Sequence, residues 1–150
     1  VPGSSGTPGE LNGCADTAKT LGNVEQNTEL GIYGRIFTRT GNIVVETGDM
    51  HTGPATIIST VNGHEAKEYD AEINRIYNET GGQRMMLTVT DPELRSITGG
   101  IVQGMSGSPV MQDGKLVGAV THVFVSDPCK GFGISIYDML ETAGIREQAA

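Results

Sequence analysis

The chain of 150 residues has the length of one domain, and its 37% of hydrophobic residues with 22 glycines is typical of a globular, turn-rich protein. Eighteen acidic against ten basic residues give a net charge of −8, which argues against a nucleic-acid-binding protein and against docking on anionic lipid. No apolar run approaches the roughly 20 residues that span a bilayer, and the lack of tryptophan disfavours a carbohydrate-binding sandwich.

The chain begins with residues 1–29, which are rich in small and polar residues and predict a loop with at most one short extended piece. From Leu30 onward, short β-type runs separated by turn dipeptides predict antiparallel strands. The predicted strands are Leu30–Thr38, Asn42–Glu46, Ala55–Val61, His64–Ile76, Gln83–Thr90, Ser108–Gln112, Lys115–Val125 and Phe132–Ile134. Asn62-Gly63 and Asp113-Gly114 each predict a type I′ hairpin turn, because such dipeptides tolerate positive φ at both central positions.

Two short helices complete the predicted elements. Asp91-Pro92 offers an N-cap followed by proline at the first helical position. Ser135–Ala143 carries apolar residues at helical spacing and ends at Gly144. Many short strands with few helices predict an all-β fold, an antiparallel barrel or sandwich with a short C-terminal helix packed on it.

The run Gly104-Met105-Ser106-Gly107-Ser108-Pro109 is the segment that suggests chemistry. Acyl transfer needs a hydroxyl held out at a tight turn, beside amides that receive the oxyanion. Glycines around Ser106 permit such a turn, and the amides of Gly104 and Ser106 are the natural donors. A β-hairpin follows the motif, as in chymotrypsin-like proteases, whereas a helix follows it in α/β-hydrolases. A plain glycine-rich turn is the competing interpretation.

A resemblance that extends well beyond this motif favours the serine-protease interpretation over a plain glycine-rich turn. The run from Thr98 to Val125, and upstream Pro8–Leu11 and Gly22–Gly34, are similar to the peptidase domain of the stage IV sporulation protein B family. The resemblance implies a chymotrypsin-like serine endopeptidase with antiparallel barrels, of which this chain holds mostly the second. It also implies Ser106 as the nucleophile and Asp91 as its acidic partner, although the residues alone make Asp91 an N-cap just as readily.

The family's catalytic histidine lies in a segment before Pro8–Leu11, and its PDZ domain and membrane anchor also lie outside these residues. We therefore expect residues 1–150 to be a partial peptidase domain that is inactive alone. His51 and His64 sit in no family motif. On the strand after the nucleophile, Thr121, His122 and Val123 are candidates to bind substrate, with a buried structural histidine as the alternative for His122.

The remaining expectations concern cofactors, partners and location. The histidines lack metal-ligand spacing, so we expect no metal and no cofactor. Cys14 and Cys129 permit one disulfide, with free thiols as the alternative. The family implies that the enzyme cleaves itself and a membrane-bound inhibitor of an intramembrane protease, in the space between the membranes around the forespore, to trigger sigma-factor processing. Open strand edges allow a homo-oligomer, and the alternative function is a catalytically silent β-barrel that binds peptides by strand addition.

Overall fold

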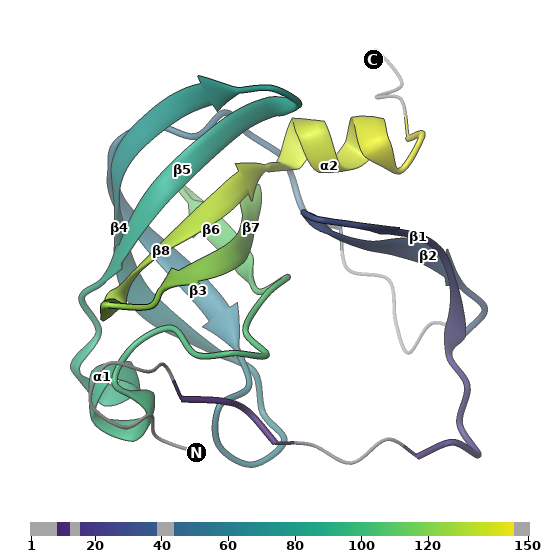
Figure 1. Cartoon of the computed structure of the whole chain (residues 1–150), viewed down its shortest axis with the longest axis horizontal. Helices are drawn as coiled ribbons and strands as arrows, with labels where there is room; N and C mark the ends of the chain where they lie inside the picture. Colours follow the sequence, from purple (N-terminus) through teal and green to yellow (C-terminus); the bar gives the residue numbers. More distant parts are fainter. Residues whose placement is uncertain (1–8, 13–15, 39–43, 146–150) are drawn as a thin grey trace.

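A closed barrel with a separate hairpin beside it makes up the fold (Figure 1). The computed structural model describes residues 9–12, 16–38 and 44–145. The elements are β1 (Gly22–Thr28), β2 (Gly31–Ile36), β3 (Gly53–Ser59), β4 (Lys67–Glu79), β5 (Gly82–Val89), α1 (Pro92–Thr98), β6 (Pro109–Gln112), β7 (Lys115–Phe124), β8 (Asp127–Ser135) and α2 (Ile136–Thr142). Strands β3-β4-β5-β8-β7-β6 close an antiparallel barrel, and β1 and β2 form a separate two-stranded sheet. The predicted all-β barrel with a short C-terminal helix is confirmed.

The barrel interior is filled by the alternate residues of each strand. Ile57 on β3, Ile73 on β4 and Leu87 on β5 are fully buried, while their chain neighbours face outward or lie half-buried. This period of two is typical of strands that turn one face to a core. Closure gives each barrel strand a paired strand on both sides, although some pairings cover only part of a strand, such as the two residue pairs that join β3 to β6.

The two predicted hairpin turns behave differently. Asp113 and Gly114 have φ values of 53° and 74°, so this pair forms the predicted turn between β6 and β7. Between β3 and β4 the prediction is wrong, because only Gly63 of the Asn62-Gly63 pair has positive φ. The strands stop at Ser59 and resume at Lys67, and a longer loop joins them.

The N-terminal region holds a strand where a loop was the main expectation. Residues 22–28 form β1 and pair with β2 through a turn at Glu29 and Leu30. Both strands are exposed along almost their whole length, so no apolar alternation marks β1 in the sequence. The predicted strand Asn42–Glu46 falls partly outside the described residues, and residues 44–46 are not in a strand.

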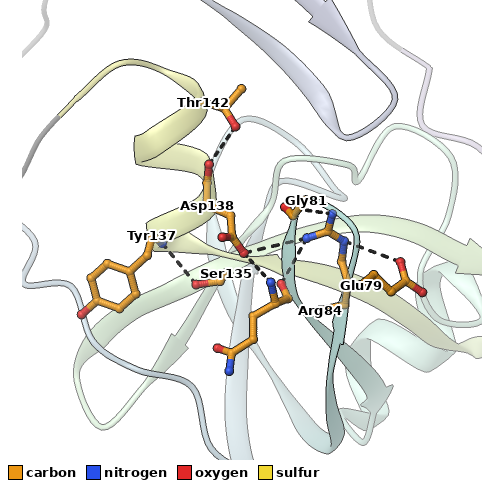
Figure 2. A network of polar contacts seen from close by, with 8 residues as sticks. Glu79, Gly81, Arg84, Ser135, Tyr137, Asp138 and Thr142 are labelled. Carbon is orange, nitrogen blue, oxygen red and sulfur yellow. Dashed lines mark hydrogen bonds and ion pairs between the residues drawn. The ribbon is translucent and has the colours of Figure 1, made fainter.

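Helix α2 is fixed to the β4–β5 hairpin by Asp138. Its side chain accepts a hydrogen bond from the Gln83 amide at 2.6 Å, and it lies 3.8 Å from the Arg84 guanidinium (Figure 2). Ser135 caps the helix by accepting a hydrogen bond from the Tyr137 amide at 3.2 Å. Gly82 leaves room for the carboxylate, since a Cβ there would come within 2.2 Å of it. The predicted helix over Ser135–Ala143 is confirmed, one residue shorter at each end.

Candidate active site

The nucleophile motif forms a loop that is anchored by one side chain and exposes the next. Met105 is only 1% exposed and packs in the barrel core, whereas Ser106 is exposed to solvent. Gly104 and Gly107 on either side have φ values of 97° and 89°, which side chains rarely adopt. A Cβ at Gly107 would meet nothing within 4 Å, so glycine is required there by backbone conformation, and the space beside it is open.

The backbone amides of this loop divide into two groups. Those of Met105, Gly107 and Ser108 donate to the carbonyls of Val102, Val120 and Met105, at 3.1, 2.7 and 3.0 Å. Within the described part of the chain, the amides of Gly104 and Ser106 have no hydrogen-bond acceptor. These are the two donors predicted for the oxyanion. Unpaired, exposed amides are what a developing negative charge requires.

The hydroxyl of Ser106 points at β7. Its Oγ donates to the Thr121 carbonyl oxygen at 2.8 Å. The carbonyl accepts the hydrogen bond that the hydroxyl would otherwise donate to a general base, so in this arrangement the hydroxyl is held in place and is not activated. Thr121 itself is buried, so its carbonyl is held in a fixed position beside the nucleophile.

A partly open cavity of about 250 Å³ lies beside Ser106. Residues of β7, β8 and α2 line it together with the turn of the β1–β2 hairpin and the first residues of β2. The lining residues are Leu30, Gly31, Ile32, Tyr33, Ser106, Gly107, Ala119, Val120, Thr121, Ile134 and Met139. Sequence reasoning missed the hairpin turn at this site, and the resemblance over Gly22–Gly34 was the only signal for it.

The N-terminal segment supports the approach to the loop. The Leu11 amide donates to the Gln103 carbonyl at 2.8 Å, and the Gln103 amide donates to the Gly9 carbonyl at 2.9 Å. Leu11 also packs against the barrel core, and a Cβ at Gly104 would come within 3.1 Å of the Leu11 Cβ. The segment that resembles the family upstream therefore lies next to the candidate oxyanion site.

The edge of β7 beyond the nucleophile is open. Strand β6 pairs with β7 only from Lys115 to Ala119, and the loop at Gly107 and Ser108 then bonds to Val120. From His122 onward, β8 is the only strand paired with β7 among the residues that the structure describes. An extended peptide can add to such an edge by main-chain hydrogen bonds. The three predicted substrate-binding residues, Thr121, His122 and Val123, lie at the start of this edge.

Asp91 is the N-cap of α1. Its Oδ1 accepts from the Leu94 amide at 2.8 Å, and its Oδ2 accepts from the Asp70 amide at 3.2 Å. These backbone hydrogen bonds, that from Leu94 first, lower the pKa of Asp91 below its usual 3.8. Its ionised form therefore stabilises the fold above the unfolded pKa, and this contribution is lost as the pH falls through the folded pKa.

Within the described residues, Asp91 and Ser106 share no hydrogen bond. Asp91 bonds to Asp70 on β4, whereas Ser106 bonds to Thr121 on β7. In the ring of six strands, β4 and β7 are three places apart, the largest separation that the ring allows. The acidic role that the resemblance implies for Asp91 stays a prediction, and the cap is the role that the contacts support.

Replacing Asp91 with asparagine separates these roles. We expect Asp91→Asn to lower the free energy of unfolding by about 1 kcal/mol, because asparagine is a good N-cap but cannot also accept from the Asp70 amide. We expect kcat to stay within about threefold, whereas amidating an orienting carboxylate costs about 10⁴. Urea unfolding and peptide hydrolysis by the natural-length protein measure both quantities. A 10⁴-fold loss of kcat in the folded variant would establish the catalytic role instead.

The three histidines lie in different parts of the barrel. His51 Nε2 is 2.6 Å from Asp113 Oδ2, and this hydrogen bond raises the pKa of His51 above 6.5. His64 is exposed in the loop between β3 and β4. His122 is exposed rather than buried, and it lines a second cavity with Thr121. Within the described residues, no histidine hydrogen-bonds to Ser106.

Other predicted features bear little on the site. The Cys14–Cys129 disulfide involves Cys14, which lies outside the described residues, and Cys129 Sγ donates to the Gly99 carbonyl at 3.5 Å. Across the described ranges, no three His, Cys, Asp or Glu side chains are grouped so that they could hold a metal ion. Neither helix in this part of the chain is long and apolar enough to cross a membrane.

Comparisons with known proteins complete the description of the site. The family model described as SpoIVB peptidase S55 matches residues 1–140. Among solved structures, the chain is similar to Rv3671c from M. tuberculosis, in the inactive form of a serine-to-alanine mutant, with a TM-score of 0.60, 14% identity and coverage of 86% of this chain and 67% of that one. The active form of the Rv3671c protease gives a TM-score of 0.59 and 14% identity over 85% of this chain and 60% of that one. No curated protein matches.

Proposed function

The chain belongs to the SpoIVB peptidase family, and from this premise we propose that it is a serine endopeptidase domain with Ser106 as its nucleophile. One observation carries the proposal. The Ser106 hydroxyl is exposed on a glycine-flanked turn, and the free amides of Gly104 and Ser106 lie in the same loop. A turn that served only to connect strands would gain nothing from two unpaired amides beside an exposed hydroxyl.

The proposed reaction is acyl transfer through a covalent intermediate. Ser106 Oγ attacks the scissile carbonyl carbon while a general base takes its proton, and the carbonyl oxygen becomes an oxyanion that accepts from the two amides. The base returns the proton to the leaving amine as the C–N bond breaks. Water then attacks the acyl-enzyme by the same route in reverse, which releases the acid and restores the hydroxyl.

We propose that a histidine acts as the base, as the resemblance implies for the segment upstream of Pro8–Leu11. In this structure the Thr121 carbonyl accepts the hydrogen bond of the Ser106 hydroxyl. An imidazole next to Ser106 would take the place of this carbonyl as the acceptor. The substrate would lie along the open edge of β7 at Thr121, His122 and Val123, with its backbone as an added strand.

The biological role is proposed on the family alone. We propose that the protein cleaves itself and a membrane-bound inhibitor of an intramembrane protease, between the membranes around the forespore, and so triggers sigma-factor processing. The two exposed edges of the β1–β2 sheet also offer a surface for a second copy of the chain.

Covalent labelling tests the proposed function. A fluorophosphonate reacts with an activated serine hydroxyl and not with an ordinary one. We expect the natural-length protein to be labelled at one position, and peptide mass spectrometry to place the label on Ser106. Ser106→Ala should abolish labelling, while the control Ser108→Ala should keep it, because the Ser108 hydroxyl lies 3.3 Å from that of Ser59.

A silent peptide-binding barrel is the second candidate. The open β7 edge favours it, because strand addition needs no nucleophile. An unlabelled natural-length protein that still binds extended peptides at this edge would support the binding module and refute the peptidase.

A further inference from the structure

A second cavity adjoins the nucleophile cavity, and we infer that it binds a lysine or arginine side chain of the peptide substrate. This inference rests on the proposed function, because it names the side chain that the substrate strand presents there. The cavity has a volume of about 710 Å³. Its lining residues are Glu29, Leu30, Tyr77, Glu79, Arg84, Thr121, His122 and Phe132.

The position of this cavity links it to the nucleophile. Thr121 and Leu30 line both cavities, and the carbonyl of Thr121 holds the Ser106 hydroxyl at 2.8 Å. Phe132 is paired with His122 across β8 and β7, so the cavity extends over the outer face of the sheet next to the open edge. Because side chains of an extended peptide alternate between two sides, a strand added to β7 directs every second side chain towards one side, where the cavity opens.

The charges of the lining favour a cation. The lining contains two carboxylates, those of Glu29 and Glu79, and one arginine, Arg84. Arg84 is already balanced, since its guanidinium lies 4.0 Å from the Glu79 carboxylate and 3.8 Å from that of Asp138 (Figure 2). Within the described residues, Glu29 has no cation within ion-pair distance. The cavity therefore holds a surplus of negative charge, which attracts an ammonium or guanidinium group.

The aromatic residues of the lining suit the same ligand. Phe132 stacks on Phe124 at 4.9 Å between ring centroids, and Tyr77 is half-buried. The Arg75 guanidinium already lies 5.9 Å from the Tyr77 ring centroid, which shows that this part of the surface accommodates a cation on a ring. The apolar stem of a lysine or arginine can pack on such rings while its head reaches a carboxylate.

Peptide binding to the chain tests the inference without any need for catalysis. Blocked alanine tetrapeptides that carry either lysine or uncharged norleucine at one position are titrated, and the NMR shifts of the Thr121, His122 and Phe132 amides are followed. We expect the lysine peptide to bind roughly fivefold more tightly, the size of one partly exposed ion pair with a cation–π contact. We expect the preference to shrink as salt rises from about 0.05 to 0.5 M.

Two variants identify the determinant. Glu29→Gln should reduce the lysine preference to less than about twofold, while Glu68→Gln, an exposed neutralisation on β4 outside the cavity, should keep it. Equal affinities for the two peptides, no shifts at the three amides, or a preference that survives Glu29→Gln would each overturn the inference. Labelling of Ser106 is measured separately, so a failed subsite with a labelled serine leaves the proposed peptidase intact.

Discussion

Ser106→Ala is expected to lower kcat for peptide hydrolysis by about 10⁶ in the natural-length protein, because loss of the nucleophile removes the function of the whole catalytic unit. We expect kcat to fall and KM to stay almost unchanged. The substrate would bind along the open β7 edge, and the Ser106 hydroxyl is not one of the groups of that edge. Steady-state kinetics on a fluorogenic peptide, together with a thermal unfolding curve, measure the outcome. The variant should remain folded because Ser106 is exposed.

Ser108→Ala is the matched control for this experiment. Ser108 follows in the same loop, but its hydroxyl is half-buried and contacts Ser59 at 3.3 Å. We expect its kcat to stay within about tenfold, because no transition-state contact is removed. If Ser106→Ala kept more than about a hundredth of the activity, Ser106 would not be the nucleophile and the proposed chemistry would fail.

Asp138→Ala is expected to lower the free energy of unfolding by about 3 kcal/mol, the low end for removal of one partner from a buried ion pair. The Arg84 side chain is only 6% exposed, and that of Asp138 is 20% exposed. Without Asp138, the guanidinium keeps the Glu79 carboxylate at 4.0 Å and long hydrogen bonds to the carbonyls of Gln83 at 3.3 Å and Gly81 at 3.4 Å. The Gln83 amide loses its acceptor. The midpoint of thermal unfolding should fall by roughly 10 °C.

Urea unfolding of two further variants isolates the cause. Glu141→Ala changes an exposed acidic residue on the same helix and should alter stability by less than about 0.5 kcal/mol. Combining Asp138→Ala with Arg84→Met should recover part of the loss, because no buried charge is then left without a partner. A loss below about 1 kcal/mol for Asp138→Ala would show that Arg84 is adequately solvated or paired without α2.

Features that depend on a few consecutive residues could be predicted from the sequence. The Asp113-Gly114 turn, the N-cap at Asp91 and the glycine-flanked turn at Ser106 all follow from local backbone preferences. The Asn62-Gly63 turn shows the limit of such reasoning. The preference of Asn-Gly for a tight turn is weaker than the pairing of β3 with β4. This pairing ends at Ser59 and Lys67, so a longer loop joins the two strands.

Contacts between distant segments could not be predicted in this way. β1 has a polar sequence and is exposed on both faces, so it lacks the alternation that marks a buried strand. Its turn nevertheless reaches Ser106 and covers the nucleophile cavity. Nothing in the motif predicts that Met105 is buried, although its burial fixes the loop to the barrel.

By itself, the sequence determined the strand-rich fold and the serine turn, because β-type runs and φ preferences depend on short stretches of chain. The family followed from the resemblance of longer runs of residues to a known family. Only the tertiary structure decided which residues share a site. The contacts of the folded chain joined Asp91 to β4 and α1 and Ser106 to β7, and packing of the hairpin turn brought Glu29 and Leu30 beside β7. These placements depend on the summed burial of many side chains around the ring, which no short segment encodes.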